Sequence, residues 1–152
     1  MNFDPFVAMK PCEIVNIFTP EMSSPGGQPM AQSAISAGFP SPAEGLISNK
    51  LDLNRELVKN PASTFYARVS GYSMRDEGIS DGDLLVIDKS VEPYDGCLAV
   101  AYIDGDFTLK RFADHGEYGL LVPANEEFEP IRVTADNDFM IWGVVRYVIK
   151  KV

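Results

Sequence analysis

From Thr64 to Ile149 the sequence is divided into short apolar segments, and this division restricts the fold more than any other feature. Seven segments are rich in β-branched or aromatic residues and are bounded by Gly, Asp or Pro: TFYARVS, DLLVID, GCLAVAYI, DFTLKRF, YGLLVP, EPIRVT and FMIWGVVRYVI. Such segments are typical of β-strands. The sequence therefore predicts a mainly β protein, a compact and curled sheet with little helix.

One short helix is predicted before these strands, in LDLNRELVKNP (51–61). Asp52 is placed to cap it, Leu53 and Leu57 share one face, and Asn60-Pro61 ends it. Residues 38–152 are accordingly predicted to form one β domain.

Residues 1–37 differ in composition from the rest of the chain. They hold three acids, one base and few large apolar side chains after Phe18, as in SSPGGQPMAQSAISAG. Such a segment buries little surface, so it is predicted to be a flexible N-terminal arm. Ile14, Ile17 and Phe18 are expected to let its first half dock on a surface that the sequence does not identify.

The net charge of −9 argues against direct DNA binding, which clustered Lys and Arg normally drive. A protein partner is the expectation.

No apolar run reaches transmembrane length, and the N-terminus lacks the pattern of a signal peptide, so a cytoplasmic protein without a membrane contact is predicted. Cys12, Cys97 and His115 give no metal-binding spacing. Reduced thiols, no metal and no cofactor are expected.

A hairpin is predicted around Asp104-Gly105, a pair of residues that favours a two-residue turn. Pairing outward from this turn places Ala101 opposite Thr108 and Ala99 opposite Lys110. Alternation then gives a large apolar face, and a second face of small residues that carries one amine. From the pattern alone, Lys110 is either a solvated strand lysine or a lysine held in a cleft.

The segment SGYSMRDEGISDGD (70–83) contains the second candidate residue, Ser73. Gly71 permits a sharp turn before it, and Met74 is expected to pack inward. A structural alternative is that Ser73 and Asp76 form a capping box, with Ser73 as a helix cap. A Ser-His-Asp triad is strongly disfavoured because the one histidine, His115, lies in a polar turn, which leaves lysine as the available base.

Lysine acts as a base only when its pKa falls well below the usual value of about 10.4. Burial among apolar residues lowers a lysine pKa by up to about 3–5 units. The small-residue face around Lys110 would provide such surroundings if another part of the chain covers it.

Three motifs together resemble the LexA/UmuD family of self-cleaving serine-lysine peptidases, and most closely its UmuD-like mutagenesis proteins. They are AGFPSPAEG, SGYSM followed by ISDGDLLVID, and DGDFTLKRF. The resemblance extends from Ala37 nearly to the C-terminus. The separation of 110 − 73 = 37 residues between Ser73 and Lys110 also fits the family.

The resemblance implies that Ser73 is the nucleophile and Lys110 the general base, which later protonates the leaving amine. The backbone N–H groups of Tyr72 and Ser73 would stabilise the oxyanion. The scissile bond would be Ala37-Gly38, where small side chains let the backbone enter a narrow cleft. The Phe-Pro-Ser-Pro that follows restricts the new N-terminal end.

The resemblance also implies a role in the SOS response to DNA damage. A RecA–single-stranded DNA filament would promote self-cleavage, and the processed chain would form homodimers and join a Y-family translesion polymerase subunit. The sequence departs from the nearest relatives in two ways. Its arm is longer, and Ala37 precedes the scissile bond, as in the repressor branch.

Three other classes compete with this interpretation. A LexA-like or phage repressor needs a DNA-binding domain, which the first 37 residues, with one lysine and no arginine, do not provide. A signal peptidase needs a membrane anchor. In a non-catalytic β interaction module, Ser73 would be a cap and Lys110 solvated.

Overall fold

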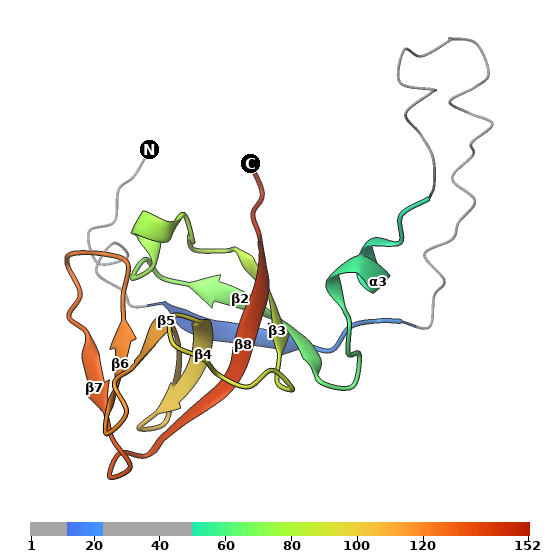
Figure 1. Cartoon of the computed structure of the whole chain (residues 1–152). Helices are drawn as coiled ribbons and strands as arrows, with labels where there is room; N and C mark the ends of the chain where they lie inside the picture. The colour runs from blue at the N-terminus through green and yellow to red at the C-terminus, as the bar shows by residue number, and fades with distance from the viewer. Residues whose placement is uncertain (1–11, 23–49) are drawn as a thin grey trace, which may run out of the picture.

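The structure is a computed structural model that describes residues 12–22 and 50–152 (Figure 1). Two short helical segments occur within these ranges, α3 (Leu53–Leu57) and the 3-10 turn η2 (Arg75–Glu77). The strands are β1 (Glu13–Phe18), β2 (Thr64–Ser70), β3 (Leu84–Asp88), β4 (Leu98–Ile103), β5 (Asp106–Asp114), β6 (Gly119–Val122), β7 (Ile131–Val133) and β8 (Phe139–Ile149). The prediction of a mainly β chain is confirmed.

All described strands belong to one sheet, in the order β1-β2-β3-β8-β4-β5-β6-β7. An additional pairing of Glu13 in β1 with Thr108 in β5 joins the first strand to the sixth. The sheet therefore curls until six strands close on themselves, while β6 and β7 extend it beyond the closure (Figure 1). Closure pairs part of the β1 edge with β5, while β7 is the terminal strand at the other end of the sheet.

Each of the seven segments predicted to be strands contains a strand. The predicted bounds of β2 and β8 agree fully with the structure, and the other strands differ by one to three residues at their ends. The hairpin register is also confirmed, because Ala101 pairs with Thr108 and Ala99 with Lys110. Asp104 and Gly105 both have positive φ, at 48° and 94°, as a two-residue hairpin turn requires.

Helix α3 begins as predicted, because the Asp52 carboxylate accepts a hydrogen bond from the Arg55 backbone N–H at 3.3 Å. It ends at Leu57, before the predicted stop at Asn60. Leu53 is 60% exposed, so the helix lacks the buried apolar face that would stabilise further turns.

Strand β1 lies within the segment that the sequence predicts to be a flexible arm. It pairs antiparallel with β2 from Glu13 to Phe18. Ile14 packs against the core, whereas Ile17 and Phe18 remain 44% and 47% exposed. The expected docking therefore occurs through backbone pairing more than through the apolar side chains. The other residues of the predicted arm, 1–11 and 23–37, lie outside the described part of the chain.

The two faces of the β4–β5 hairpin are both buried. The large apolar face packs into the main core, where Leu98, Val100 and Leu109 join residues of β2 and β3. The small-residue face contributes Cys97 and Ala99 to a second cluster with Val144 of β8. Lys110 is on this second face and is only 2% exposed. The alternative of a solvated lysine is therefore wrong.

Gly143 in β8 marks a point where the core leaves no space for a side chain. A Cβ built there would lie 2.5 Å from the Ile87 side chain of β3. We expect Gly143→Ala to lower the free energy of unfolding by about 1–3 kcal/mol, because the core must shift to admit a methyl group. Denaturant unfolding would measure this, with the exposed Arg146→Ala in the same strand as control. Equal stabilities for the two variants would contradict the expectation.

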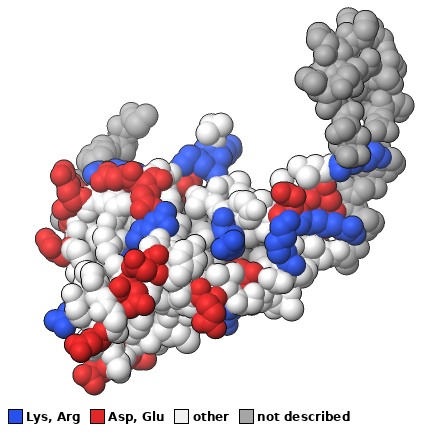
Figure 2. All heavy atoms as spheres, viewed as in Figure 1, with Lys and Arg blue, Asp and Glu red and all other residues white. Residues whose placement is uncertain are grey.

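Charged side chains are interspersed on the face shown in Figure 2. Uncharged surface and acidic groups lie between the Lys and Arg side chains there, so this face carries no continuous basic stripe of the kind that tracks a nucleic-acid backbone. Within residues 12–22 and 50–152, no helix is both long and apolar enough to cross a membrane.

Candidate active site

Ser73 and Lys110 meet in the interior of the protein. The Lys110 Nζ lies 2.8 Å from the Ser73 Oγ, within hydrogen-bonding distance. Ser73 has no exposed surface, and Lys110 is almost as deeply buried. The structure thus brings together the two residues that the sequence singled out separately, one in the loop after β2 and one in β5.

The loop that carries Ser73 is held by backbone hydrogen bonds to the segment after β6. Gly71 takes a φ of 106°, which makes the predicted sharp turn. The Ser73 carbonyl accepts from the Ala124 N–H at 2.7 Å, and the Ala124 carbonyl accepts from the Asp76 N–H at 2.7 Å. Met74 is fully buried, as expected. These contacts fix the position of Ser73 in the protein interior.

The capping-box alternative for Ser73 is wrong. The 3-10 turn η2 starts at Arg75, its N-cap residue is Met74, and it has no side-chain cap. The Ser73 hydroxyl instead forms hydrogen bonds with Lys110 and with the backbone of Cys12.

Three oxygen atoms surround the Lys110 amine. In addition to Ser73 Oγ, Nζ contacts Thr108 Oγ1 at 2.8 Å and the Leu109 carbonyl at 3.0 Å. A charged ammonium donates to all three. A neutral amine keeps two donors for Thr108 and Leu109 and turns its lone pair toward the Ser73 hydroxyl. The same arrangement therefore fits both protonation states, and the neutral one is able to accept the hydroxyl proton.

Burial lowers the pKa of Lys110 to about 8, because an ammonium loses hydration in the interior; the Cys12 thiol, negative when ionised, opposes this shift. At pH 7 about one lysine in ten is then neutral, compared with roughly one in a few thousand at the ordinary pKa. The expectation of a depressed lysine pKa is confirmed.

Cys12, just before β1, occupies the space next to these two residues. Its backbone N–H donates to Ser73 Oγ at 2.8 Å. Its carbonyl accepts from the Thr108 hydroxyl at 2.9 Å and from the Leu109 N–H at 3.3 Å. The backbone of an extended segment is thus seated against Ser73 and the residues beside Lys110. Both cysteines, Cys12 and Cys97, are buried free thiols.

Tyr72 and Ser73 are the predicted oxyanion donors. Within the described part of the chain, no group accepts a hydrogen bond from either backbone N–H. The described residues thus offer no hydrogen-bond acceptor to either of these two N–H groups. The predicted scissile bond, Ala37-Gly38, lies outside the described residues.

Three contributors to the site are not among the site residues that the sequence predicts. Thr108 lies two residues before Lys110 in a strand, so alternation alone places it on the same face. Asn125 donates to the Tyr72 carbonyl at 3.0 Å and fastens the Ser73 loop, and Cys12 contacts Ser73 directly. No sequence pattern points to Asn125 or Cys12, because their contacts join distant positions.

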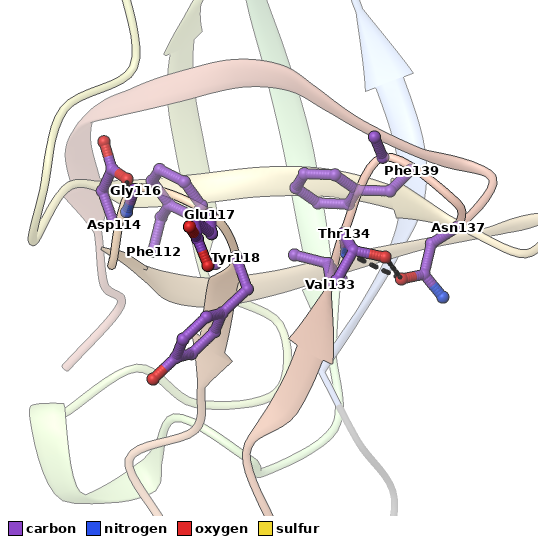
Figure 3. Close-up of a pocket in the computed structure, with 11 residues that line it drawn as sticks. Phe112, Asp114, Gly116, Glu117, Tyr118, Val133, Thr134, Asn137 and Phe139 are labelled. Carbon is purple, nitrogen blue, oxygen red and sulfur yellow. Dashed lines mark hydrogen bonds between the residues drawn. The ribbon is translucent and has the colours of Figure 1, made fainter.

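A separate pocket of about 310 Å³ lies at the far end of β5 (Figure 3). Aromatic rings and two carboxylates line it, together with parts of β7 and the loop that follows. The labelled lining residues are Phe112, Asp114, Gly116, Glu117, Tyr118, Val133, Thr134, Asn137 and Phe139. Neither Ser73 nor Lys110 contributes to it.

His115 stacks on Tyr118 nearby, with ring centres 5.0 Å apart. Among the described residues, no group of three or more potential metal ligands is present.

Comparison with known proteins relates most of the chain to one family. The model for "Peptidase S24-like" matches residues 29–146. Protein MucA of Salmonella typhimurium is 42% identical over 120 residues, which cover 78% of this chain and 82% of the relative. Protein ImpA of Shigella flexneri is 38% identical over 130 residues, with coverages of 82% and 84%. The LexA repressor of Idiomarina loihiensis is 38% identical over 117 residues, which cover 76% of this chain but 57% of the repressor. The chain therefore belongs to the Peptidase S24-like family, as a UmuD-like member of its LexA/UmuD group.

Proposed function

We propose that this protein cleaves its own chain at Ala37-Gly38, with Ser73 as nucleophile and Lys110 as general base. The observation that carries this proposal is the 2.8 Å contact between Lys110 Nζ and Ser73 Oγ in a fully buried setting. A buried lysine with a depressed pKa next to a serine hydroxyl is the arrangement that activates a nucleophile without histidine. The S24 peptidase family membership supports the reaction class.

The reaction would proceed by acyl transfer. Ser73 Oγ attacks the Ala37 carbonyl carbon while Lys110 Nζ takes the hydroxyl proton. The C–N bond then breaks, and Lys110 returns the proton to the Gly38 nitrogen. Water hydrolyses the Ala37 ester of Ser73, again with Lys110 as base. The backbone N–H groups of Tyr72 and Ser73 are the proposed donors to the oxyanion.

The rate of self-cleavage is expected to follow the neutral fraction of Lys110. Because deprotonation creates the active base, the rate should rise with pH, about fiftyfold between pH 6 and pH 8, and level off above the pKa of about 8. Intact mass spectrometry of the purified chain over time would measure it. The expected product begins at Gly38 and contains 152 − 37 = 115 residues.

Addition of RecA, nucleotide and single-stranded DNA provides a second condition for the same measurement. A rate that falls as pH rises from 6 to 8 would contradict a lysine base. A chain that stays intact at every pH, with and without the filament, would contradict self-cleavage as a whole.

The broader biological role follows from the UmuD-like relationship. We propose that cleavage takes place in the SOS response, that the RecA–single-stranded DNA filament stimulates it, and that the fragment starting at Gly38 acts as a homodimer with a Y-family translesion polymerase subunit. The similarity to the MucA and ImpA proteins, over 82% and 84% of their lengths, supports this assignment.

A further inference from the structure

The segment seated against Ser73 is not the proposed cleavage segment. It is Cys12, which is 37 − 12 = 25 residues upstream of Ala37, and the strand β1 that follows it. We infer that the position of β1 between β2 and β5 receives one extended segment at a time, so that β1 competes with the Ala37-Gly38 segment for Ser73. This inference rests on the proposed function and assigns β1 as the occupant of the site in the uncleaved chain.

The backbone of Cys12 lies where a substrate peptide would have to approach Ser73. A scissile carbonyl carbon must approach the Ser73 Oγ to about 3–3.5 Å before attack. The Cys12 nitrogen already lies 2.8 Å from that oxygen. Ser73 has no exposed surface and Lys110 has 2%, so no second peptide reaches the hydroxyl while Cys12 stays in place.

The groups beside Lys110 are occupied as well. The Thr108 hydroxyl and the Leu109 N–H both donate to the Cys12 carbonyl. Glu13 continues the contact by pairing with Thr108 in β5. An incoming segment that needed the same edge of β5 would have to displace all three interactions.

The peptide bond from Cys12 to Glu13 is not presented to Ser73 for cleavage. Its carbonyl is turned to Thr108 and Leu109, on β5, and not to the N–H groups of Tyr72 and Ser73. The oxyanion donors therefore have no carbonyl from Cys12 to stabilise. The uncleaved chain accordingly holds a resident strand against the nucleophile.

The pairing of β1 with β2 gives this state its stability. Five residue pairs join the two strands, and the side chains of Cys12 and Ile14 reach the main core. Cys12 itself is fully buried. Release of β1 exposes these groups, so any factor that favours release would increase cleavage by a shift in population.

A reversible disulfide between β1 and β2 tests the inference in the full-length chain. Asn16 and Arg68 are paired in register and both are exposed. Paired residues in antiparallel strands lie at Cα separations that a disulfide spans. In the Asn16→Cys/Arg68→Cys variant, we expect oxidation to slow cleavage at Ala37-Gly38 at least tenfold. A reductant should restore the rate of the unmodified chain. Each single variant serves as a control that cannot form the bond.

Equal rates for the oxidised and reduced forms would overturn the inference and leave the proposed function intact. Absence of cleavage in the unmodified chain would instead count against the proposed function. A second measurement then decides the inference without any catalysis.

Alkylation of Cys12 by iodoacetamide reports how often β1 leaves its position. A synthetic peptide of residues 33–45, SAISAGFPSPAEG, contains the proposed scissile bond. We expect this peptide to raise the labelling rate of Cys12 at least threefold, as it competes with β1. Cys97 is buried in a different cluster and should show no change, which makes it the internal control. An unchanged Cys12 rate at saturating peptide would overturn the inference, whether or not the chain cleaves itself.

Discussion

Replacement of Ser73 by alanine is expected to stop self-cleavage, with a loss of more than about 10³-fold in rate, while the chain remains folded. The other contacts of Lys110 Nζ among the described residues are the Leu109 carbonyl, which has no hydroxyl, and Thr108 Oγ1, whose hydroxyl donates to the Cys12 carbonyl. Intact mass spectrometry at pH 8–9 would measure the missing fragment, and thermal unfolding would confirm the fold.

A loss of stability alone would not identify a nucleophile. Ser73→Ala removes the acceptor of both the Cys12 N–H and the Lys110 amine, and an unsatisfied buried donor costs about 1–3 kcal/mol. A purely structural serine in a β interaction module would show the same cost and no chemical change. Ser80→Ala, in the same loop, is the matched control and should cleave at the normal rate. Cleavage by the Ser73→Ala variant would refute the nucleophile.

Much of the fold could be predicted because its signals are local. Strands β2 and β8 have long runs of β-branched and aromatic residues, and Asp104-Gly105 fixes the register of the β4–β5 hairpin. The faces of that hairpin followed from alternation. The helix α3 was predicted too long, since the capping residue marks its start whereas tertiary packing determines how far it continues.

Strand β1 could not be predicted as part of the sheet because its pairing is long-range. Glu13–Phe18 is a short segment in a composition typical of a mobile arm, and its partners lie some fifty residues later, in β2. Residues around Ser73 show the same limit. The contact of Cys12 with Ser73 joins positions 61 residues apart, and neither residue has a local pattern that reveals it.

The sequence predicts the pair of Ser73 and Lys110 only when its motifs are taken together. Each residue alone fits a structural role, as a cap or as a solvated lysine. The structure removes both of these roles, because Ser73 caps no helix and Lys110 is buried. What the sequence does not contain is the depth of burial, and that depth sets the pKa of the lysine.

Lys110→Met is expected to slow self-cleavage by about 10²–10⁴-fold, the usual contribution of a general base. Methionine retains most of the length and volume of lysine, so the packing beside Ala99 of β4 should persist. The pH dependence should also change. Without an ionising amine, the residual rate should continue to rise with hydroxide concentration and show no plateau near pH 8. Intact mass spectrometry across pH 6–10 measures both effects.

Two further variants test whether Lys110 acts as a base or only through its positive charge. Lys110→Arg retains the charge but does not deprotonate, because a guanidinium keeps its proton in proteins, so it should be as slow as Lys110→Met. Lys89→Met removes a lysine whose amine lies over the Trp142 ring, at 4.9 Å from its centre and apart from Ser73, and should leave the rate unchanged. A normal rate in Lys110→Arg would mean that charge alone suffices at this position. A normal rate in Lys110→Met would remove Lys110 from the reaction and leave its contact with Ser73 as a structural hydrogen bond.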